Sequence, residues 1–87
     1  MNWQVYLILC SDNSLYTGIT TDSERRLRQH AAGRGAKYFR GRRPVRIAFC
    51  EGGHTRSSAA TRELQIKHLN RDAKAGLIAA AGSAPSR

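Results

Sequence analysis

The stretch that decides the fold is YTGITTDSERRLRQH, residues 16–30. Residues 15–20 have the β-branched and aromatic content of a strand. Thr21 and, three residues later, Glu24 have the form of a capping box, the side-chain pair that satisfies free backbone N–H groups at the start of a helix. The stretch therefore predicts a strand that is followed at once by a helix.

A basic helix is expected over residues 23–32. It is expected to end at Gly33, because glycine tolerates the left-handed conformation that is common just beyond a helix. Arg26 and His30 are four residues apart, so their side chains lie on one face of this helix, beside its apolar stripe. A cation and an imidazole are thereby held on a rigid element close to Tyr16.

The composition predicts one small, basic domain. The chain has 87 residues, with 15 Lys and Arg against 6 Asp and Glu, and a net charge of +9. Nine of those cations lie between residues 25 and 50, where no acidic residue occurs. Charges that served solubility alone would not require this segregation of sign. The distribution favours a polyanion as partner, nucleic acid before a membrane, since no long amphipathic basic helix is present.

The two cysteines, Cys10 and Cys50, each end an apolar strand-like run and have no second Cys or His at metal-ligand spacing. We expect buried, reduced thiols, and neither a disulfide framework nor a zinc site. The first residues do not resemble a signal peptide, and no stretch has the length of a membrane span. A cytoplasmic protein is expected.

The N-terminal part of the chain predicts a β-hairpin. Residues 3–10 are apolar on both faces, as in a central strand, and turn-forming residues 11–14 join them to the strand at 15–20. The loop decides whether Tyr6 and Tyr16 share a face of the sheet. An odd number of loop residues would place them on the same side, whereas four would separate them.

The remaining chain supplies further elements. We expect a Gly- and Arg-rich loop with a short helical turn at Tyr38 and Phe39, and then a strand over 45–51 that is closed by Gly52 and Gly53. A helix is expected over 56–69, capped by Thr55 or Ser57. A weaker helix is expected from Arg71. The loop could track a phosphate backbone with Tyr38 stacked on a base, or Tyr38 could pack on the core. The predicted class is α+β, a sandwich-like three-stranded antiparallel sheet flanked by helices. One domain is expected over residues 1–80, with a disordered tail over residues 81–87.

Glu63 falls in the middle of the apolar side of the helix expected over residues 56–69. That side is defined by Ala59, Ala60, Leu64, Ile66 and Leu69. A carboxylate in such a position must be paired or bound to a ligand, because burying it unpaired is costly. Lys67, one turn later, is a candidate ion-pair partner, and the alternative is that Glu63 holds a metal ion in a cleft. Glu63 could form the ion pair at one stage and hold the metal ion at another.

Taken together, these residues and their spacing resemble the GIY-YIG nuclease superfamily, most closely its small stand-alone bacterial members. Residues 4–6 (QVY) correspond to the first motif and residues 16–18 (YTG) to the second, and Arg26 follows the second-motif tyrosine by ten residues. The extended pattern from YTGIT through ERRLRQH to GAKYFRGRRPV is far more specific than either tripeptide. The similarity covers residues 3–78.

The resemblance implies a role for each matching residue. Tyr16 would take a proton from the attacking water, Tyr6 would orient the water or the phosphate, and Arg26 would meet the developing negative charge. His30 would assist in proton transfer or positioning, and Glu63 would hold one divalent cation, usually Mg²⁺. Because an adjacent arginine and a metal ion favour a phenolate, we expect a lowered tyrosine pKa. No small-molecule cofactor is expected.

The implied function is a metal-dependent endonuclease that hydrolyses DNA, in branched, nicked or single-stranded form, during repair or processing. The side chains expected to contact nucleic acid are Arg25, Arg34, Lys37, Tyr38, Arg40, Arg42, Arg43 and Lys67. The alternative is a protein that binds DNA or RNA and cleaves it slowly or not at all, since Ile19 and Thr20 stand where excision-repair members carry a lysine. We expect the candidate residues to converge on one concave, basic surface. The sequence does not determine an oligomeric state.

Overall fold

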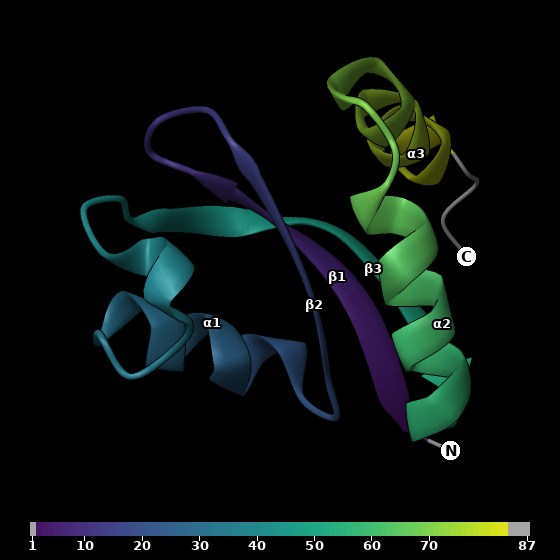
Figure 1. Ribbon diagram of the computed structural model, residues 1–87, viewed down its shortest axis with the longest axis horizontal. Helices are drawn as coiled ribbons and strands as arrows, with labels where there is room; N and C mark the ends of the chain where they lie inside the picture. Colours follow the sequence, from purple (N-terminus) through teal and green to yellow (C-terminus); the bar gives the residue numbers. More distant parts are fainter. Residues whose placement is uncertain (1, 84–87) are drawn as a thin grey trace.

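The computed structural model describes residues 2–83. It confirms a three-stranded antiparallel sheet with helices on it (Figure 1). The strands are β1 (Trp3–Cys10), β2 (Leu15–Thr20) and β3 (Pro44–His54), in the spatial order β2-β1-β3. The helices are α1 (Ser23–Ala31), α2 (Arg56–Lys67) and α3 (Arg71–Ser83), with a 3₁₀ turn, η1 (Lys37–Phe39), between α1 and β3.

β1 is the central strand because both of its faces are apolar. Val5 and Leu7 are fully buried on one face, in a core that they share with α2 and α3. Tyr6 and Ile8 are buried on the other face, where Leu27 of α1 and the aromatic side chains of η1 cover them. Since side chains alternate along a strand, one strand serves two cores. Figure 1 shows α1 and α2 on opposite sides of the sheet.

α1 begins after Asp22, whose carboxylate accepts a hydrogen bond of 3.1 Å from the N–H of Arg25. The capping box expected from Thr21 and Glu24 is therefore wrong by one residue. Asp is at least as good an N-cap as Thr, and its carboxylate also suits the positive end of the helix dipole. The expected end of the helix is confirmed, since Ala32 is the C-cap and Gly33 has a φ of 80°.

The elements after η1 differ from expectation at their ends. β3 continues through Gly52 and Gly53 as far as His54, because a shift in register lets the strand bulge and then pair again with Trp3. Gly53 has a φ of 77°, which glycine adopts without strain. α2 is capped by Thr55, one of the two expected residues. α3 runs beyond the expected boundary at residue 80, and residues 84–87 of the expected tail lie outside the described residues.

Two side chains that were expected inside the protein are exposed. Leu64 is 56% exposed, because Ala59 and Ile66 face the sheet and Leu64 lies on another side of α2. Cys50 is exposed on the edge strand β3, while Cys10 is buried, and both are free thiols. None of the helices within residues 2–83 has the length and apolar character needed to cross a bilayer.

Candidate active site

Tyr6 and Tyr16 lie on the same face of the sheet. Tyr6 is the register partner of Gly18, and Tyr16 is two residues from that glycine on the same strand. The connecting loop has the odd number of residues that this arrangement needs, since Cys10 and Ser14 still pair through a backbone hydrogen bond of 2.9 Å. The ring centroids of the two tyrosines are 6.3 Å apart.

Gly18 makes room for both phenol rings. A Cβ atom at this position would lie 2.5 Å from the Tyr6 hydroxyl oxygen and 3.1 Å from Cε2 of Tyr16. A side chain here would therefore displace both rings. We did not predict this role, although a glycine inside a strand is a signal of close approach by another group.

Gln4 ties the start of α1 to the central strand. Its side-chain oxygen Oε1 accepts a hydrogen bond of 2.9 Å from the N–H of Ser23. This N–H is at the first turn of the helix and has no partner within it. The glutamine that stands at the first position of the QVY motif thus fixes the helix that carries Arg26 and His30.

His30 holds the hydroxyl group of Tyr6. Its Nε2 atom lies 3.2 Å from that hydroxyl oxygen, and the residue is only 2% exposed. At the other edge of the ring, Nδ1 accepts a hydrogen bond of 3.1 Å from the N–H of Ala36. Since Nδ1 is an acceptor, the proton of the neutral ring is on Nε2, and His30 donates to Tyr6. The Tyr6 oxygen is thus the acceptor in this hydrogen bond, and its own hydroxyl proton is left to bind another group.

The backbone at Gly35 lies directly against the imidazole of His30. A Cβ atom at Gly35 would be 1.7 Å from Nδ1, so no other residue leaves the ring in place. Phe39 also packs on this ring, with centroids 4.3 Å apart. The sequence placed Phe39 in a short helical turn but indicated a contact with His30 for neither residue, because nothing local shows which part of the loop meets the end of α1.

Tyr38 packs on the core and covers Tyr16, with ring centroids 5.0 Å apart. The guanidinium group of Arg42 lies 4.2 Å from the centroid of the Tyr38 ring and donates to the Tyr38 carbonyl. Arg42 also forms an ion pair of 2.8 Å with Asp12. Hydrogen bonds from Ser14 and Arg42 lower the pKa of Asp12 to about 2. Tyr38 and Arg42 thus fasten η1 to the hairpin loop.

Arg26 lies close enough to act on the buried groups of this face. Its Nη1 donates to Oε1 of Gln29 at 2.9 Å, and it also interacts with the hydroxyl group of Tyr6. Its positive charge lowers the pKa of both Tyr6 and Tyr16, and it disfavours protonation of His30. The four residues expected around the reacting phosphate are therefore brought together.

Glu63 approaches this group from α2, which packs on β1 and β2 from the other face of the sheet. Its Oε2 atom is 3.3 Å from Nζ of Lys67, with side chains that are 20% and 49% exposed, so the ion pair expected one turn apart is present. The charge of Glu63 raises the pKa of Tyr6 and of Tyr16. Its carboxylate is thus within electrostatic reach of both phenols.

The pKa values of the two tyrosines are raised, which is opposite to our expectation. Burial, with a smaller contribution from Tyr16, raises the pKa of Tyr6 to about 12 against the influence of Arg26. Burial also raises the pKa of Tyr16, against Lys67 and Arg26. The loss of hydration outweighs the nearby cations. Burial and the charge of Arg26 lower the pKa of His30 to about 4, so at neutral pH its ring is uncharged.

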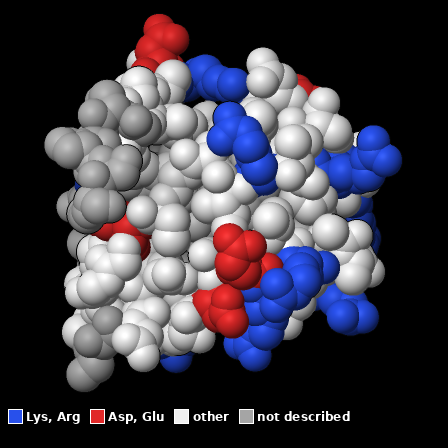
Figure 2. Space-filling view, turned by 180° about the vertical axis from the view of Figure 1, so that it is seen from behind, with Lys and Arg blue, Asp and Glu red and all other residues white. Residues whose placement is uncertain are grey.

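The remaining cations expected to contact nucleic acid are free of ion pairs. Within residues 2–83, none of Arg25, Arg34, Lys37, Arg40 and Arg43 has an acidic partner within 4.0 Å. Figure 2 shows that on one face of the molecule the Lys and Arg side chains form separate groups divided by uncharged surface, and one group lies beside acidic side chains. On that face the positive charge is not one continuous patch.

The candidate site has a single carboxylate, that of Glu63, as a ligand for a metal ion. No three His, Cys, Asp or Glu side chains come together as a metal-binding group within residues 2–83. Mg²⁺ commonly keeps several waters and binds through one or two carboxylates together with substrate phosphates. The partly exposed carboxylate of Glu63, within electrostatic reach of two phenols, fits that mode of binding.

A β-hairpin with two tyrosines on one face, and a helix that brings an arginine and a histidine to them, define a GIY-YIG catalytic domain. The family model of this domain, described as "GIY-YIG catalytic domain", matches residues 2–75. The chain therefore belongs to the GIY-YIG family.

Several relatives are named UPF0213 proteins. One from Haloquadratum walsbyi is 57% identical over 70 residues, which cover 80% of this chain and 79% of that protein. The UPF0213 protein YhbQ of Escherichia coli O8 is 47% identical over 77 residues, covering 88% and 77%. The solution NMR structure of a UPF0213 protein from Bacillus halodurans is 43% identical and superposes with a TM-score of 0.61, covering 97% of this chain and 89% of that one. These names state no activity.

Proposed function

We propose that this protein is a metal-dependent endonuclease that hydrolyses phosphodiester bonds, with DNA as the favoured substrate. The observation that carries the proposal is the convergence of Tyr6, Tyr16, His30 and Arg26 on one face of the sheet, in a chain that belongs to the GIY-YIG family. Hydroxyl groups and a guanidinium can orient the attacking water and stabilise the charge that develops on phosphate oxygens, and an imidazole can hold a hydroxyl group in place for this.

In this proposal each side chain has a distinct task. The guanidinium of Arg26 donates to non-bridging phosphate oxygens and is matched to charge that develops there. Tyr6, held by His30, uses its free proton to orient the phosphate or the attacking water. Tyr16, after its hydroxyl group has lost its own proton to solvent, takes the proton from that water as the phenolate. Lys67 and Arg26 lower the pKa of Tyr16, the direction this task requires, while burial and Glu63 oppose it.

Glu63 is the residue that would hold Mg²⁺, with water and substrate phosphate as the other ligands. Bound there, the cation would polarise the phosphate, stabilise the leaving oxygen, and neutralise the carboxylate charge that raises the pKa of both tyrosines. Lys67 would lose its partner and become available to a phosphate group. The ion pair and the metal site are thus two states of one carboxylate.

Branched, nicked or single-stranded DNA is the proposed substrate, in repair or processing, since a small module has few means to read a base sequence. Arg25, Arg34, Lys37, Arg40 and Arg43, which have no acidic partner among residues 2–83, would contact phosphates. The free thiols of Cys10 and Cys50 fit a reducing compartment such as the cytoplasm.

A second candidate function is a nucleic-acid-binding protein that cleaves slowly or not at all. One observation favours it, namely that burial raises the pKa of both phenols above their ordinary value, to about 12 for Tyr6, and so makes the phenolate harder to form. A phenol in this state does not act as a base without help. RNA remains a candidate ligand under this alternative, and would show as a preference for RNA over duplex DNA at matched salt.

A nuclease assay separates the two functions. The protein is incubated with plasmid, single-stranded and branched DNA, with Mg²⁺ or with chelator, alongside Glu63→Gln and Arg26→Ala. Glu24→Gln is the matched control, because it removes an exposed carboxylate from α1. We expect metal-dependent cleavage that both site variants lose and the control retains, with DNA binding unchanged in Glu63→Gln. Binding without cleavage on every substrate would favour the second function.

A further inference from the structure

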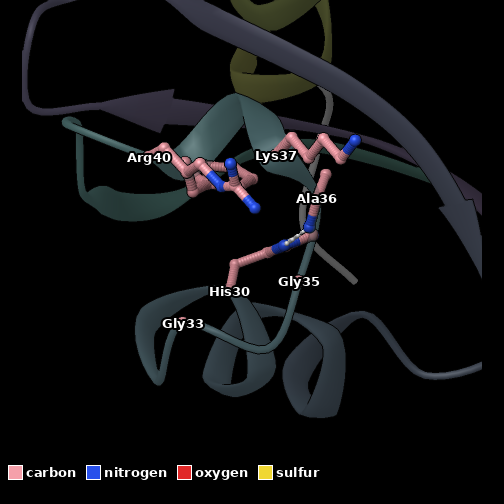
Figure 3. A pocket seen from close by; sticks show the side chains of 7 residues that line it. His30, Gly33, Gly35, Ala36, Lys37 and Arg40 are labelled. Carbon is pink, nitrogen blue, oxygen red and sulfur yellow. Dashed lines mark hydrogen bonds between the residues drawn. The ribbon is translucent and has the colours of Figure 1, made fainter.

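A cavity of about 110 Å³ lies between the C-terminal end of α1 and η1 (Figure 3). The side chains of His30, Lys37, Phe39 and Arg40 form its walls, and Gly33, Gly35 and Ala36 line the remainder. This volume has room for several water-sized groups. The expected role of Lys37 and Arg40 was contact with nucleic acid in general, and the cavity gives these two residues a defined location.

The cavity carries positive charge that the described chain does not neutralise. Figure 3 shows Arg40 and Lys37 across from His30 of α1, with the guanidinium of Arg40 directed toward the space above His30 and the ammonium of Lys37 extending away from Arg40. Neither has a hydrogen-bond or ion-pair partner for its charged group within residues 2–83, unlike Arg42, which binds Asp12. An anion in the cavity would be attracted to both cations, and the flexible side chain of Lys37 can turn toward it.

The part of the cavity wall formed by His30 and Phe39 is fixed before any ligand arrives. The ring of His30 is held by the Ala36 N–H on one edge and by Tyr6 on the other. Phe39 lies against this ring, and Gly35 allows the backbone to meet it. Binding of a small ion therefore needs ordering only of the Lys37 and Arg40 side chains and not of the ring that separates the cavity from Tyr6.

The position of the cavity relates it to the site of hydrolysis. The imidazole ring of His30 separates the cavity from the site of hydrolysis, because its Nε2 faces Tyr6 and its Nδ1 faces Ala36 at the cavity wall. We propose that this cavity is a second phosphate-binding subsite, which takes a backbone phosphate adjacent to the one that is hydrolysed. The substrate assignment rests on the proposed function, whereas the recognition of phosphate by Lys37 and Arg40 does not.

The ligand chemistry is tested with inorganic phosphate, followed by amide and imidazole NMR signals of the full chain at constant ionic strength. We expect the amides of Gly33, Gly35 and Ala36 and the ring of His30 to shift together. The double variant Lys37→Gln/Arg40→Gln should bind phosphate roughly tenfold more weakly or worse, since each cation contributes a charge-assisted hydrogen bond. Arg46→Gln/Lys74→Gln removes the same charge elsewhere and should stay within about twofold of the parent. Equal losses in both variants, or shifts spread over the surface, would overturn the subsite.

The source of the phosphate is tested in chelator, where no cleavage occurs, with single-stranded DNA that carries one neutral methylphosphonate linkage at varied positions. At one position in the DNA, the neutral linkage should weaken binding to the parent protein. The same linkage should not weaken binding to Lys37→Gln/Arg40→Gln, because this variant has already lost the contact. If phosphate binds in the cavity but no linkage position behaves this way, the ligand is free phosphate and the backbone assignment is overturned. If the subsite is confirmed and the nuclease assay shows no cleavage, the proposed function fails and the subsite stands.

Discussion

The hydroxyl oxygen of Tyr6 lies 3.2 Å from Nε2 of His30, and the histidine is the donor in this hydrogen bond. The direction follows from the Ala36 N–H, which occupies Nδ1 and leaves the ring proton on Nε2. A neutral imidazole that donates cannot at the same time take a proton from Tyr6. His30 is therefore placed to position the phenol, and the proton of Tyr6 is left for the phosphate or the water.

The first prediction concerns stability against pH. The pKa of His30 is about 4 in the folded protein, against 6.5 for an ordinary histidine, so the unfolded chain binds a proton at a higher pH than the folded one. The stabilisation is fully present above pH 6.5 and is lost as the pH falls toward 4. We expect a loss of about 2 kcal/mol between pH 7.5 and pH 5 from this group.

Urea unfolding at the two pH values measures this loss. His30→Gln should remove most of the difference between them, whereas His68→Gln, at an exposed position on the surface, should retain it. An unchanged difference in His30→Gln would show that the histidine is not held neutral by burial.

The second prediction concerns Gly18. Replacing it with alanine places a methyl group 2.5 Å from the hydroxyl oxygen of Tyr6, and overpacking of this kind typically costs about 1–3 kcal/mol. We expect Gly18→Ala to lower the free energy of unfolding by that amount and to abolish cleavage. Gly52→Ala is the control, because a Cβ there meets nothing within 4 Å. Equal stability of the two variants in urea would contradict the proposed crowding.

The third prediction concerns Gln4. Its side chain accepts from the Ser23 N–H at 2.9 Å, so Gln4→Ala leaves this N–H without its partner and should cost about 1 kcal/mol. Because the same bond places α1, hydrogen exchange at the start of α1 should become faster than in the parent. Gln4→Glu, which keeps an acceptor oxygen, should preserve both properties. Unaltered exchange in Gln4→Ala would mean that α1 is positioned without this contact.

The fourth prediction concerns Lys67, whose charge lowers the pKa of Tyr16. Lys67→Met should raise the pH at which Tyr16 ionises, as followed by ultraviolet difference spectroscopy. It should also strengthen Mg²⁺ binding. In the parent protein the Glu63 carboxylate is 3.3 Å from Nζ of Lys67, and the variant removes this competing cation. Arg71→Met, on α3, serves as the control for a lost charge. Weaker Mg²⁺ binding in Lys67→Met would place the metal elsewhere.

The sequence determined the identity of the elements and of most candidate residues, because these depend on local patterns. Alternation of apolar side chains marks β1 as a strand covered on both faces. The helical period places Arg26 with His30, and Glu63 with Lys67. These patterns depend only on residues that are close in the chain. The central strand of the sheet, the basic helix and the ion pair on α2 could therefore all be predicted.

The tertiary structure decided what depends on groups distant in the chain. The odd-numbered loop placed Tyr6 and Tyr16 on one face, and Gly18 and Gly35 gained their roles only from the rings that meet them. The sign of the tyrosine pKa shifts also reversed, because burial by surrounding elements outweighs the cation on the neighbouring helix. A sequence pattern gives the charge of a neighbour, but the loss of water around a phenol is a property of the whole fold.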